Sequence, residues 1–173
     1  MNELSPEASA LITKLFDARG ATLLAFAQVE WFSAKLIVEA ASLEQYRGLD
    51  LSFTQDASKR AEKLKAILEV EGPLSPYAEE LRTTIDQVLG YQELRNFAAH
   101  GMLIRPDPGD FSLYSPIHLR MFQMFKGGKL VELKKDTTLK EYTDDQEALA
   151  AAAQKYISIV RTVWKDLGLK DLE

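Results

Sequence analysis

Residues 75–101 read SPYAEELRTTIDQVLGYQELRNFAAHG, and their pattern decides the fold class of the chain. Ser75 and Pro76 are typical of a helix start. Serine can cap the first turn, and proline fits the first helical position because the backbone N–H that it lacks has no partner there. Apolar residues then recur every three or four positions, which is typical of a helix packed in a bundle. This stripe consists of Tyr77, Leu81, Ile85, Val88, Tyr91, Leu94 and Ala98. We therefore predict one helix over residues 75–100.

Four more helices are expected from similar signals. Ser5-Pro6-Glu7 starts the first helix, which runs up to a break or kink at Gly20. A long second helix covers residues 21–46, and a third covers residues 55–71. Thr143-Asp144-Asp145-Gln146 has the spacing of a capping box and opens the last helix.

Side-chain periodicity also predicts which residues face the core. The expected core stripe of the second helix is Leu23, Ala27, Trp31, Ala34, Val38 and Ala41. Aromatic residues bury the most apolar area, so we assign four of them to core or interface packing rather than to a cofactor site. These are Trp31, Phe32, Tyr156 and Trp164.

The segment before the last helix differs from the rest. It is rich in β-formers, and Gly127-Gly128 separates two apolar runs, which predicts a hairpin or an irregular insertion at about 111–136. The expected fold is therefore all-α, a four- to five-helix up-and-down bundle carrying this insertion before the C-terminal helix. We find no repeat or long linker, so residues 1–173 are expected to form a single domain.

Composition narrows the function classes. The chain has no cysteine and two histidines, so thiolate chemistry is excluded and we expect no metal or other cofactor. The N-terminus lacks the pattern of a signal peptide, and the most apolar window, residues 21–29, is too short to cross a bilayer. These features predict a cytoplasmic protein with no membrane partner.

The net charge of −5 is unfavourable for a general nucleic-acid binder, but the charge is uneven. Residues 117–135 contain five cations and one anion. One interpretation is a local surface for a polyanion such as RNA. The other is a solvated hairpin whose lysines protect its edge.

Arg95, Asn96 and His100 form the most informative motif. On a helix Asn96 and His100 share a face that lies about 200° from Ala98, so both are expected to point away from the core. Arginine binds phosphate oxygens with a planar fork of donors, and histidine transfers protons near neutral pH. The motif therefore suits phosphodiester cleavage without a metal, with Asn96 holding the imidazole or donating to phosphate.

Structural interpretations remain for each residue. His100 could act as a cation at a helix C-terminus, where the dipole favours it by roughly 0.3–1 kcal/mol. Arg95 could pair with Glu93, Asp86 or another acid. The full Arg-Asn-x-x-x-His string is expected by chance in roughly one chain of this length in a hundred.

Arg-Asn-Phe-Ala-Ala-His-Gly, closing a helix in a helical domain of this size, resembles the motif of the HEPN superfamily (higher eukaryotes and prokaryotes nucleotide-binding domains). That signature is an arginine, a polar residue and a histidine four to six positions beyond the arginine. The resemblance is sharp over about seven residues. It implies a helical bundle that forms a homodimer with facing motifs, and a metal-independent endoribonuclease that uses the 2′-OH of RNA in transesterification.

The resemblance also implies roles for particular residues. Arg95 and His100 would be the catalytic pair with Asn96 in support, and Glu30 would be the acidic residue that some members place on an earlier helix. The residues expected to bind RNA are Arg120, Lys126, Lys129 and Lys134. A toxin or defence role would bring an antitoxin or nucleotidyltransferase-like protein partner, although Met102 replaces the tyrosine that such a transferase modifies.

Two functions from different classes stay open. The first is the dimeric ribonuclease described above. The second is a non-catalytic dimeric helical module that binds a protein or a nucleotide through the same face. Other enzymes are disfavoured because the chain has no Walker loop, nucleophile elbow or zinc-binding helix motif.

Overall fold

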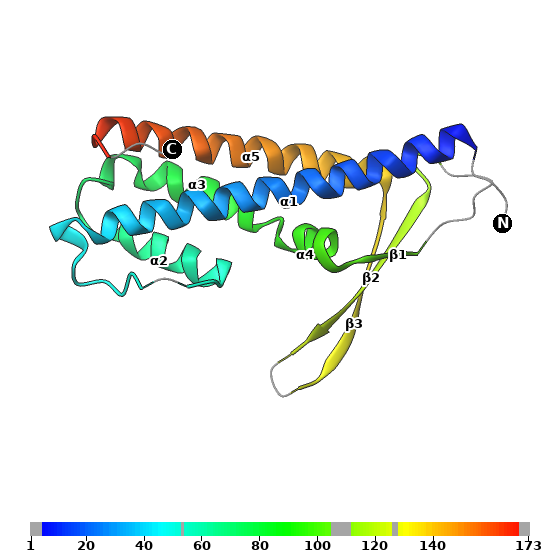
Figure 1. The fold of residues 1–173 in the computed structure, drawn as a ribbon, viewed down its shortest axis with the longest axis horizontal. Helices are drawn as coiled ribbons and strands as arrows, with labels where there is room; N and C mark the ends of the chain where they lie inside the picture. The colour runs from blue at the N-terminus through cyan, green and yellow to red at the C-terminus, as the bar shows by residue number, and fades with distance from the viewer. Residues whose placement is uncertain (1–4, 53, 105–111, 126–127, 170–173) are drawn as a thin grey trace. The chain divides into compact units, whose positions relative to one another are not determined.

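The computed structural model describes residues 5–52, 54–104, 112–125 and 128–169. These residues are mostly helical, with a small antiparallel sheet before the C-terminal helix (Figure 1). The helices are α1 (Pro6–Ala41), α2 (Ala57–Glu69), α3 (Ala78–Leu89), α4 (Gln92–His100) and α5 (Leu139–Asp166), with 3₁₀ turns at Glu44–Tyr46 and Ser75–Tyr77. The strands are β1 (Met102–Ile104), β2 (Pro116–Met124) and β3 (Leu130–Thr138), in the order β1-β2-β3.

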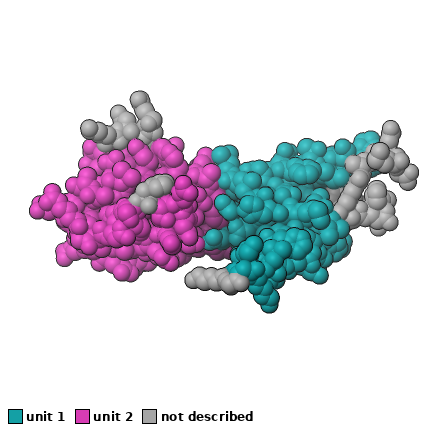
Figure 2. Space-filling view, turned by 60° about the horizontal axis from the view of Figure 1, so that its bottom comes forward, with its two compact units in different colours: residues 1–24, 91–150 teal, residues 25–90, 151–173 magenta. Residues whose placement is uncertain are grey.

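The chain divides into two compact units, each made of two separate segments (Figure 2). Unit 1 comprises Met1–Leu24 and Tyr91–Ala150, and unit 2 comprises Ala25–Gly90 and Ala151–Glu173. Unit 1 thus contains the start of α1, α4, the sheet and the start of α5. Unit 2 contains the rest of α1 and α5 together with α2 and α3.

The sheet of unit 1 has one buried and one exposed face. Ile117, Leu119 and Met121 of β2 alternate toward the buried face, as expected for a half-buried antiparallel sheet. Helix α4 lies close to β2 and buries Leu94, Phe97 and Ala98. This packing holds α4 against β2, so that the opposite side of α4, which carries the motif, faces outward.

Unit 2 contains polar groups that are buried with partners. The hydroxyls of Ser33 and Tyr156 lie 2.7 Å apart, and the Tyr46 hydroxyl accepts a hydrogen bond from the Leu74 backbone at 3.0 Å. Burial raises the pKa of Tyr156, with desolvation as the main cause, so this phenol stays neutral as a hydrogen-bonding group. These bonds let unit 2 bury whole tyrosines without leaving their hydroxyls unsatisfied.

The prediction of a helical protein with an insertion before the last helix is confirmed, but the fold is not all-α. The predicted hairpin exists, since β2 and β3 pair from Pro116–Thr138 to Met124–Leu130. A third strand, β1, follows α4 directly and pairs with β2. β1 has three residues, too few for an alternation of apolar and polar residues to be recognised in the sequence.

The predicted break at Gly20 is wrong, because α1 is one helix of 36 residues. Glycine in a helix costs roughly 1 kcal/mol relative to alanine, which the rest of a long helix tolerates. Ser5 does start this helix, and its hydroxyl accepts a hydrogen bond from the Ala8 backbone at 3.2 Å.

The predicted core stripe of α1 is also wrong. Leu23, Trp31 and Val38 are exposed, whereas the buried face includes Phe26, Val29, Phe32, Leu36 and Ile37. The helix is apolar on both sides, so periodicity alone does not distinguish the core face. By length and composition α1 is the one helix in the described ranges that could cross a membrane, although 44% of that apolar window is buried within the protein.

Residues 75–100 form three elements rather than one helix. A 3₁₀ turn at Ser75–Tyr77 precedes α3, and Gly90 caps α3 before α4 begins at Gln92. The central stripe is nevertheless buried, at Leu81, Ile85, Val88, Leu94 and Ala98. Glycine ends α3 because it has the highest entropy cost of ordering in a helix interior.

The predicted capping box at Thr143 is wrong in position. Thr143 is buried inside α5, and its hydroxyl donates to the Leu139 and Lys140 carbonyls at 2.9 Å. The capping box is formed by Thr138 and Glu141. The Thr138 hydroxyl accepts from the Glu141 backbone at 3.1 Å, while the Glu141 carboxylate accepts from the Thr138 backbone at 2.9 Å.

Candidate active site at the end of α4

Helix α4 presents the three motif residues from its last turns. Arg95 and Asn96 are half-buried, and His100, the last helical residue, is exposed. The buried neighbours Leu94, Phe97 and Ala98 face the other way. The outward orientation expected for His100 is therefore found, and Asn96 is more covered than expected.

Arg95 and Asn96 contact each other directly. The Arg95 Nη1 donates to the Asn96 Oδ1 at 3.3 Å. This bond uses the amide oxygen and leaves the amide NH₂ as a donor for another group. The expected bond from Asn96 to the imidazole is not found, and within the described ranges His100 has no hydrogen-bond or ion-pair partner.

The acids proposed as structural partners of Arg95 are engaged elsewhere. The Glu93 carboxylate lies 3.4 Å from the Lys135 ammonium, and the Asp86 carboxylate forms an ion pair with Lys65. Among the described residues no carboxylate is paired with Arg95. Its guanidinium is therefore a cation that can accept an external anion.

Arg19 of α1 caps the C-terminal end of α4. Its Nη2 donates to the Ala98 and Gly101 carbonyls at 2.8 Å each, and its Nε donates to the Ala98 carbonyl at 3.2 Å. The last carbonyls of a helix have no intrahelical donor, so a cation with several N–H groups satisfies them well. The role of helix-terminal cation, proposed above for His100, is thus served by Arg19.

Gly101 is the single residue that connects α4 to β1. Its N–H donates to the Phe97 carbonyl at 2.9 Å, and its backbone is already extended. A Cβ at this position would overlap with the Phe97 carbonyl oxygen, so glycine is required by close approach rather than by a special φ. Met102 then begins β1, which places His100 two residues from the sheet.

The residues expected to bind RNA are distributed unevenly. Arg120 and Lys134 lie directly opposite each other on β2 and β3, and Lys129 is exposed near the hairpin turn. Lys126 lies outside the described residues. The sheet therefore brings two of the four predicted residues together.

The second histidine lies on the same sheet face as Arg120. The His118 Nδ1 and Asp136 Oδ1 are 2.9 Å apart, and the Arg120 Nη1 is 3.5 Å from the same carboxylate. The hydrogen bond with His118 lowers the pKa of Asp136 most, and nearby Arg120 and Lys134 lower it further. The pairing of His118 with Asp136 depends on strand register, so no role of His118 could be expected from the sequence.

Glu30 belongs to unit 2, where it has a partner of its own. Its carboxylate accepts from the Arg60 Nη2 at 2.7 Å, and the Glu30 side chain is partly exposed. The structure thus gives Glu30 an ion pair within its unit.

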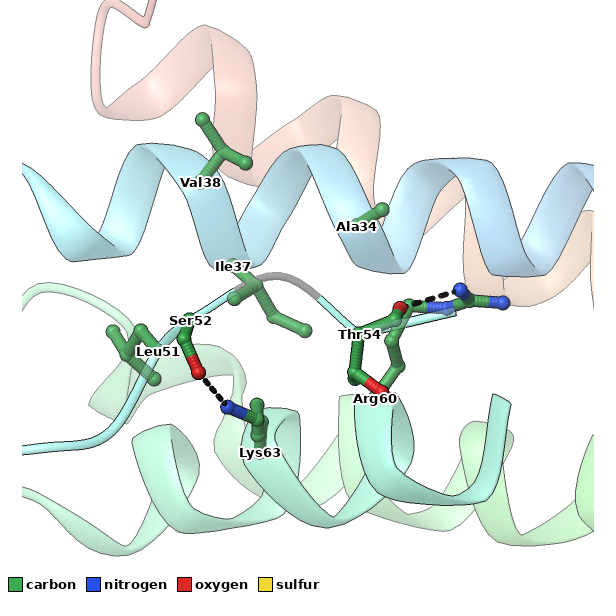
Figure 3. A pocket seen from close by; sticks show the side chains of 8 residues that line it. All are labelled: Ala34, Ile37, Val38, Leu51, Ser52, Thr54, Arg60 and Lys63. Carbon is green, nitrogen blue, oxygen red and sulfur yellow. Dashed lines mark hydrogen bonds between the residues drawn. The ribbon is translucent and has the colours of Figure 1, made fainter. Parts of the chain in front are cut away.

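A small pocket of about 40 Å³ in unit 2 is lined by apolar residues, two hydroxyl side chains and two cations (Figure 3). Both cations are already engaged. Arg60 donates to the Thr54 carbonyl at 2.9 Å, and Lys63 donates to the Ser52 hydroxyl at 3.0 Å (Figure 3). Lys63 also donates to the Asp50 carbonyl at 2.9 Å, so we place no reaction there.

Within the ranges that the structure describes, no group of three or more His, Cys, Asp or Glu residues could hold a metal ion. Compared with known proteins, the chain matches no family model, no curated protein and no solved structure. The residues at the end of α4 are therefore the basis on which a function can be inferred.

Proposed function

We propose that this protein is an endoribonuclease of the HEPN type, which cleaves RNA by attack of the 2′-OH and needs no metal or other cofactor. Arg95 and His100 are the catalytic residues, and Asn96 supports Arg95. The helices of the chain form the up-and-down bundle of that superfamily, and the protein acts in the cytoplasm as a toxin or defence component held by an antitoxin-like partner.

One observation carries the proposal. The end of α4 is capped by Arg19, so neither Arg95 nor His100 is needed to neutralise the helix terminus. Arg95 has no acidic partner in the described chain, and His100 is exposed without a bond. Arg95, a guanidinium without an acidic partner, suits the binding of phosphate, and His100, an imidazole without a bond two turns or less away on the same helix, suits proton transfer.

The proposed reaction divides the work between these residues. The neutral His100 imidazole removes the proton of the ribose 2′-OH, and the 2′ oxygen forms a bond to phosphorus. The bond from phosphorus to the 5′ oxygen of the next nucleotide breaks, giving a cyclic phosphate and a 5′-OH. Arg95 donates to the non-bridging oxygens, where negative charge increases in the transition state.

The leaving 5′ oxygen must also gain a proton. One imidazole cannot be base and acid in the same step, so a homodimer with a second α4 end facing the first supplies the protonated His100. The dimer is therefore part of the proposal, and cleavage should require the oligomer.

The experiment is cleavage of a labelled single-stranded RNA with and without EDTA. We expect activity that resists EDTA, yields cyclic phosphate ends and falls at least about 100-fold in Arg95→Ala and His100→Ala, as expected for loss of a proton-transfer or charge-stabilising group. Lys14→Ala, which removes an exposed cation of α1, is the matched control. Unchanged cleavage in both folded motif variants would remove the proposal.

A non-catalytic interaction module is the second candidate, and exposed apolar residues on α1 favour it. Trp31 is 45% exposed and Val38 is 59% exposed, on a helix whose other face is buried. Such residues are common where another protein binds. This candidate predicts that Trp31→Ala, as well as Arg95→Ala and His100→Ala, alters association and that the wild-type protein leaves RNA intact.

A further inference from the structure

The exposed face of the three-stranded sheet in unit 1 is unusual in composition. We call the outer sheet face the side of the sheet to which His118, Arg120 and Phe122 of β2 point, because alternate residues of a strand share a face. Residues on the opposite side of β2, such as Leu119, are buried. The outer sheet face combines cations with large exposed apolar side chains.

Two cations form one row of this face. Arg120 of β2 lies directly opposite Lys134 of β3 and directly opposite Met102 of β1. Like charges directly opposite each other destabilise a sheet, so this row is unfavourable unless an anion compensates it. The available anions are only loosely placed, since Asp136 is 3.5 Å from Arg120 and Glu132 is 3.5 Å from Lys134.

The Arg120 guanidinium is also incompletely satisfied. Its side chain is 20% exposed, and its buried Nη1 makes no hydrogen bond although the Asp136 oxygen is near. A buried donor without a partner is unfavourable, but Nη1 is closed to solvent, so an incoming anion would bind the exposed part of the guanidinium. The row is therefore receptive to phosphate.

Phe122 occupies the next outward position on β2. Its side chain is 68% exposed, and it is paired with Glu132 rather than covered by an apolar neighbour. Two residues along a strand are separated by about 7 Å, so the ring lies beside the cationic row. Exposed aromatic rings beside cations on a sheet are how proteins bind unstacked bases and the attached backbone.

The outer sheet face is joined to the candidate active site through β1, although α4 packs on the opposite side of the sheet, where Lys135 contacts Glu93. Gly101 alone separates His100 from Met102, and Met102 belongs to the same row as Arg120 and Lys134. An RNA strand held on the row would reach the end of α4 by passing around the edge of the sheet at β1.

Residues 117–135 carry five cations against one anion, but on the outer sheet face Arg120 and Lys134 lie beside Asp136 and Glu132. Phosphate must therefore replace these ion pairs in order to bind.

We propose that the outer sheet face binds single-stranded RNA, with Phe122 stacked on a base and with Arg120 and Lys134 bound to the backbone. The proposal rests on the ribonuclease function and specifies the substrate as an unpaired strand. It adds Phe122, which is a binding residue and takes no part in proton transfer.

The test separates binding from cleavage by using a labelled 2′-O-methyl oligouridine, which has no free 2′-OH, in fluorescence anisotropy. We expect Phe122→Ala to weaken binding by about 10-fold or more, because stacking of one base on a ring is lost. Phe122→Tyr keeps the ring and should bind like wild type, whereas Phe122→Leu keeps apolar bulk only and should resemble Phe122→Ala. Lys134→Gln should lower the salt dependence of binding by about one phosphate contact.

Phe16→Ala is the matched control, since Phe16 is an exposed aromatic residue of α1 outside the outer sheet face, and circular dichroism checks each fold. Wild-type binding by both Phe122→Ala and Phe122→Leu overturns the inference, whatever the cleavage result. Binding retained by Phe122→Leu but lost by Phe122→Ala also overturns it and indicates an apolar protein-docking face. Ring-dependent binding together with no cleavage of natural RNA supports the face and contradicts the ribonuclease function instead.

Discussion

The guanidinium of Arg19 donates two hydrogen bonds to the carbonyl of Ala98, 79 residues away in the chain. Within unit 1 this contact fixes the end of α4, where the motif lies. It also places a permanent positive charge on the negative end of the helix dipole. The position of His100 therefore depends on a residue that belongs to no recognisable motif.

Removing this cap should weaken both folding and activity. We expect Arg19→Met, which keeps the apolar stem, to lower the free energy of unfolding by about 2 kcal/mol, because charged hydrogen bonds to helix carbonyls are lost. Urea unfolding measures the loss, and RNA cleavage should fall although Arg95 and His100 are intact. An equally active and stable variant would show that α4 holds its end without Arg19.

Two glycines should respond in opposite directions to the same substitution. Gly101→Ala should destabilise the protein by about 1–3 kcal/mol, because the new Cβ overlaps with the Phe97 carbonyl. Gly20→Ala should stabilise it by about 0.5–1 kcal/mol, because Gly20 lies inside α1 with open space around it. Thermal unfolding of both variants measures the difference, and a shift of the same sign in both would contradict the helix path described here.

The start of α5 provides a test of the capping box. Thr138→Ala should cost about 1 kcal/mol, because the hydroxyl that accepts from the Glu141 backbone is lost. Gln146→Ala, which removes the partner expected for a cap at Thr143, should change the free energy of unfolding by less than about 0.5 kcal/mol. Chemical unfolding of the pair distinguishes the two positions, and the reverse order of costs would place the cap at Thr143.

The two neighbouring aromatics of α1 test which face of this helix is the core. Their rings meet edge to face with centroids 4.9 Å apart, but Phe32 is 9% exposed and Trp31 is 45% exposed. Phe32→Ala should cost about 3–4 kcal/mol, and Trp31→Ala should cost about 1 kcal/mol. Equal costs would indicate that Trp31 is covered in solution, for example by a second copy.

Acid should weaken the sheet through Asp136. Its pKa is lowered from the usual 3.8, chiefly by the hydrogen bond with His118, so the folded state favours the carboxylate. This contribution is present above the unfolded pKa and is lost as the pH falls through the folded pKa. Comparing unfolding of wild type and Asp136→Asn across this range measures it, and we expect the variant to lose less stability below pH 4.

Sequence patterns located features that depend on one face of one element. The stripe through Leu81, Ile85 and Val88 is buried as predicted, because polar residues occupy the rest of that helix. The same reasoning failed for α1, since both of its sides are apolar and only packing selects Phe32 over Trp31. The predicted position of the capping box was wrong because Thr138 and Thr143 are both followed three residues later by Glu or Gln. Which threonine caps α5 depends on where β3 ends.

The candidate site was predictable to the extent that it is local. Arg95, Asn96 and His100 lie within six residues, so their common helix could be inferred from the sequence. The contact of Arg19 with the end of α4 and the pairing of Arg120 with Lys134 join residues that are distant in the chain. The spacing of residues along the sequence does not reveal such contacts. His118 was overlooked for the same reason, since Asp136 becomes its neighbour only through strand register.

Gly101 is the only residue between α4 and β1, so the orientation of the end of α4 is coupled to the pairing of β1. If the register of β1 on β2 shifted by one position, the Met102 side chain would point to the opposite face of the sheet. Because one residue links the strand to α4, the direction of the His100 imidazole would change as well. The pairing of the three residues of β1 with β2 thus fixes the direction of the His100 side chain, which lies outside the sheet. Any contact that stabilises this edge of the sheet would also stabilise the end of α4.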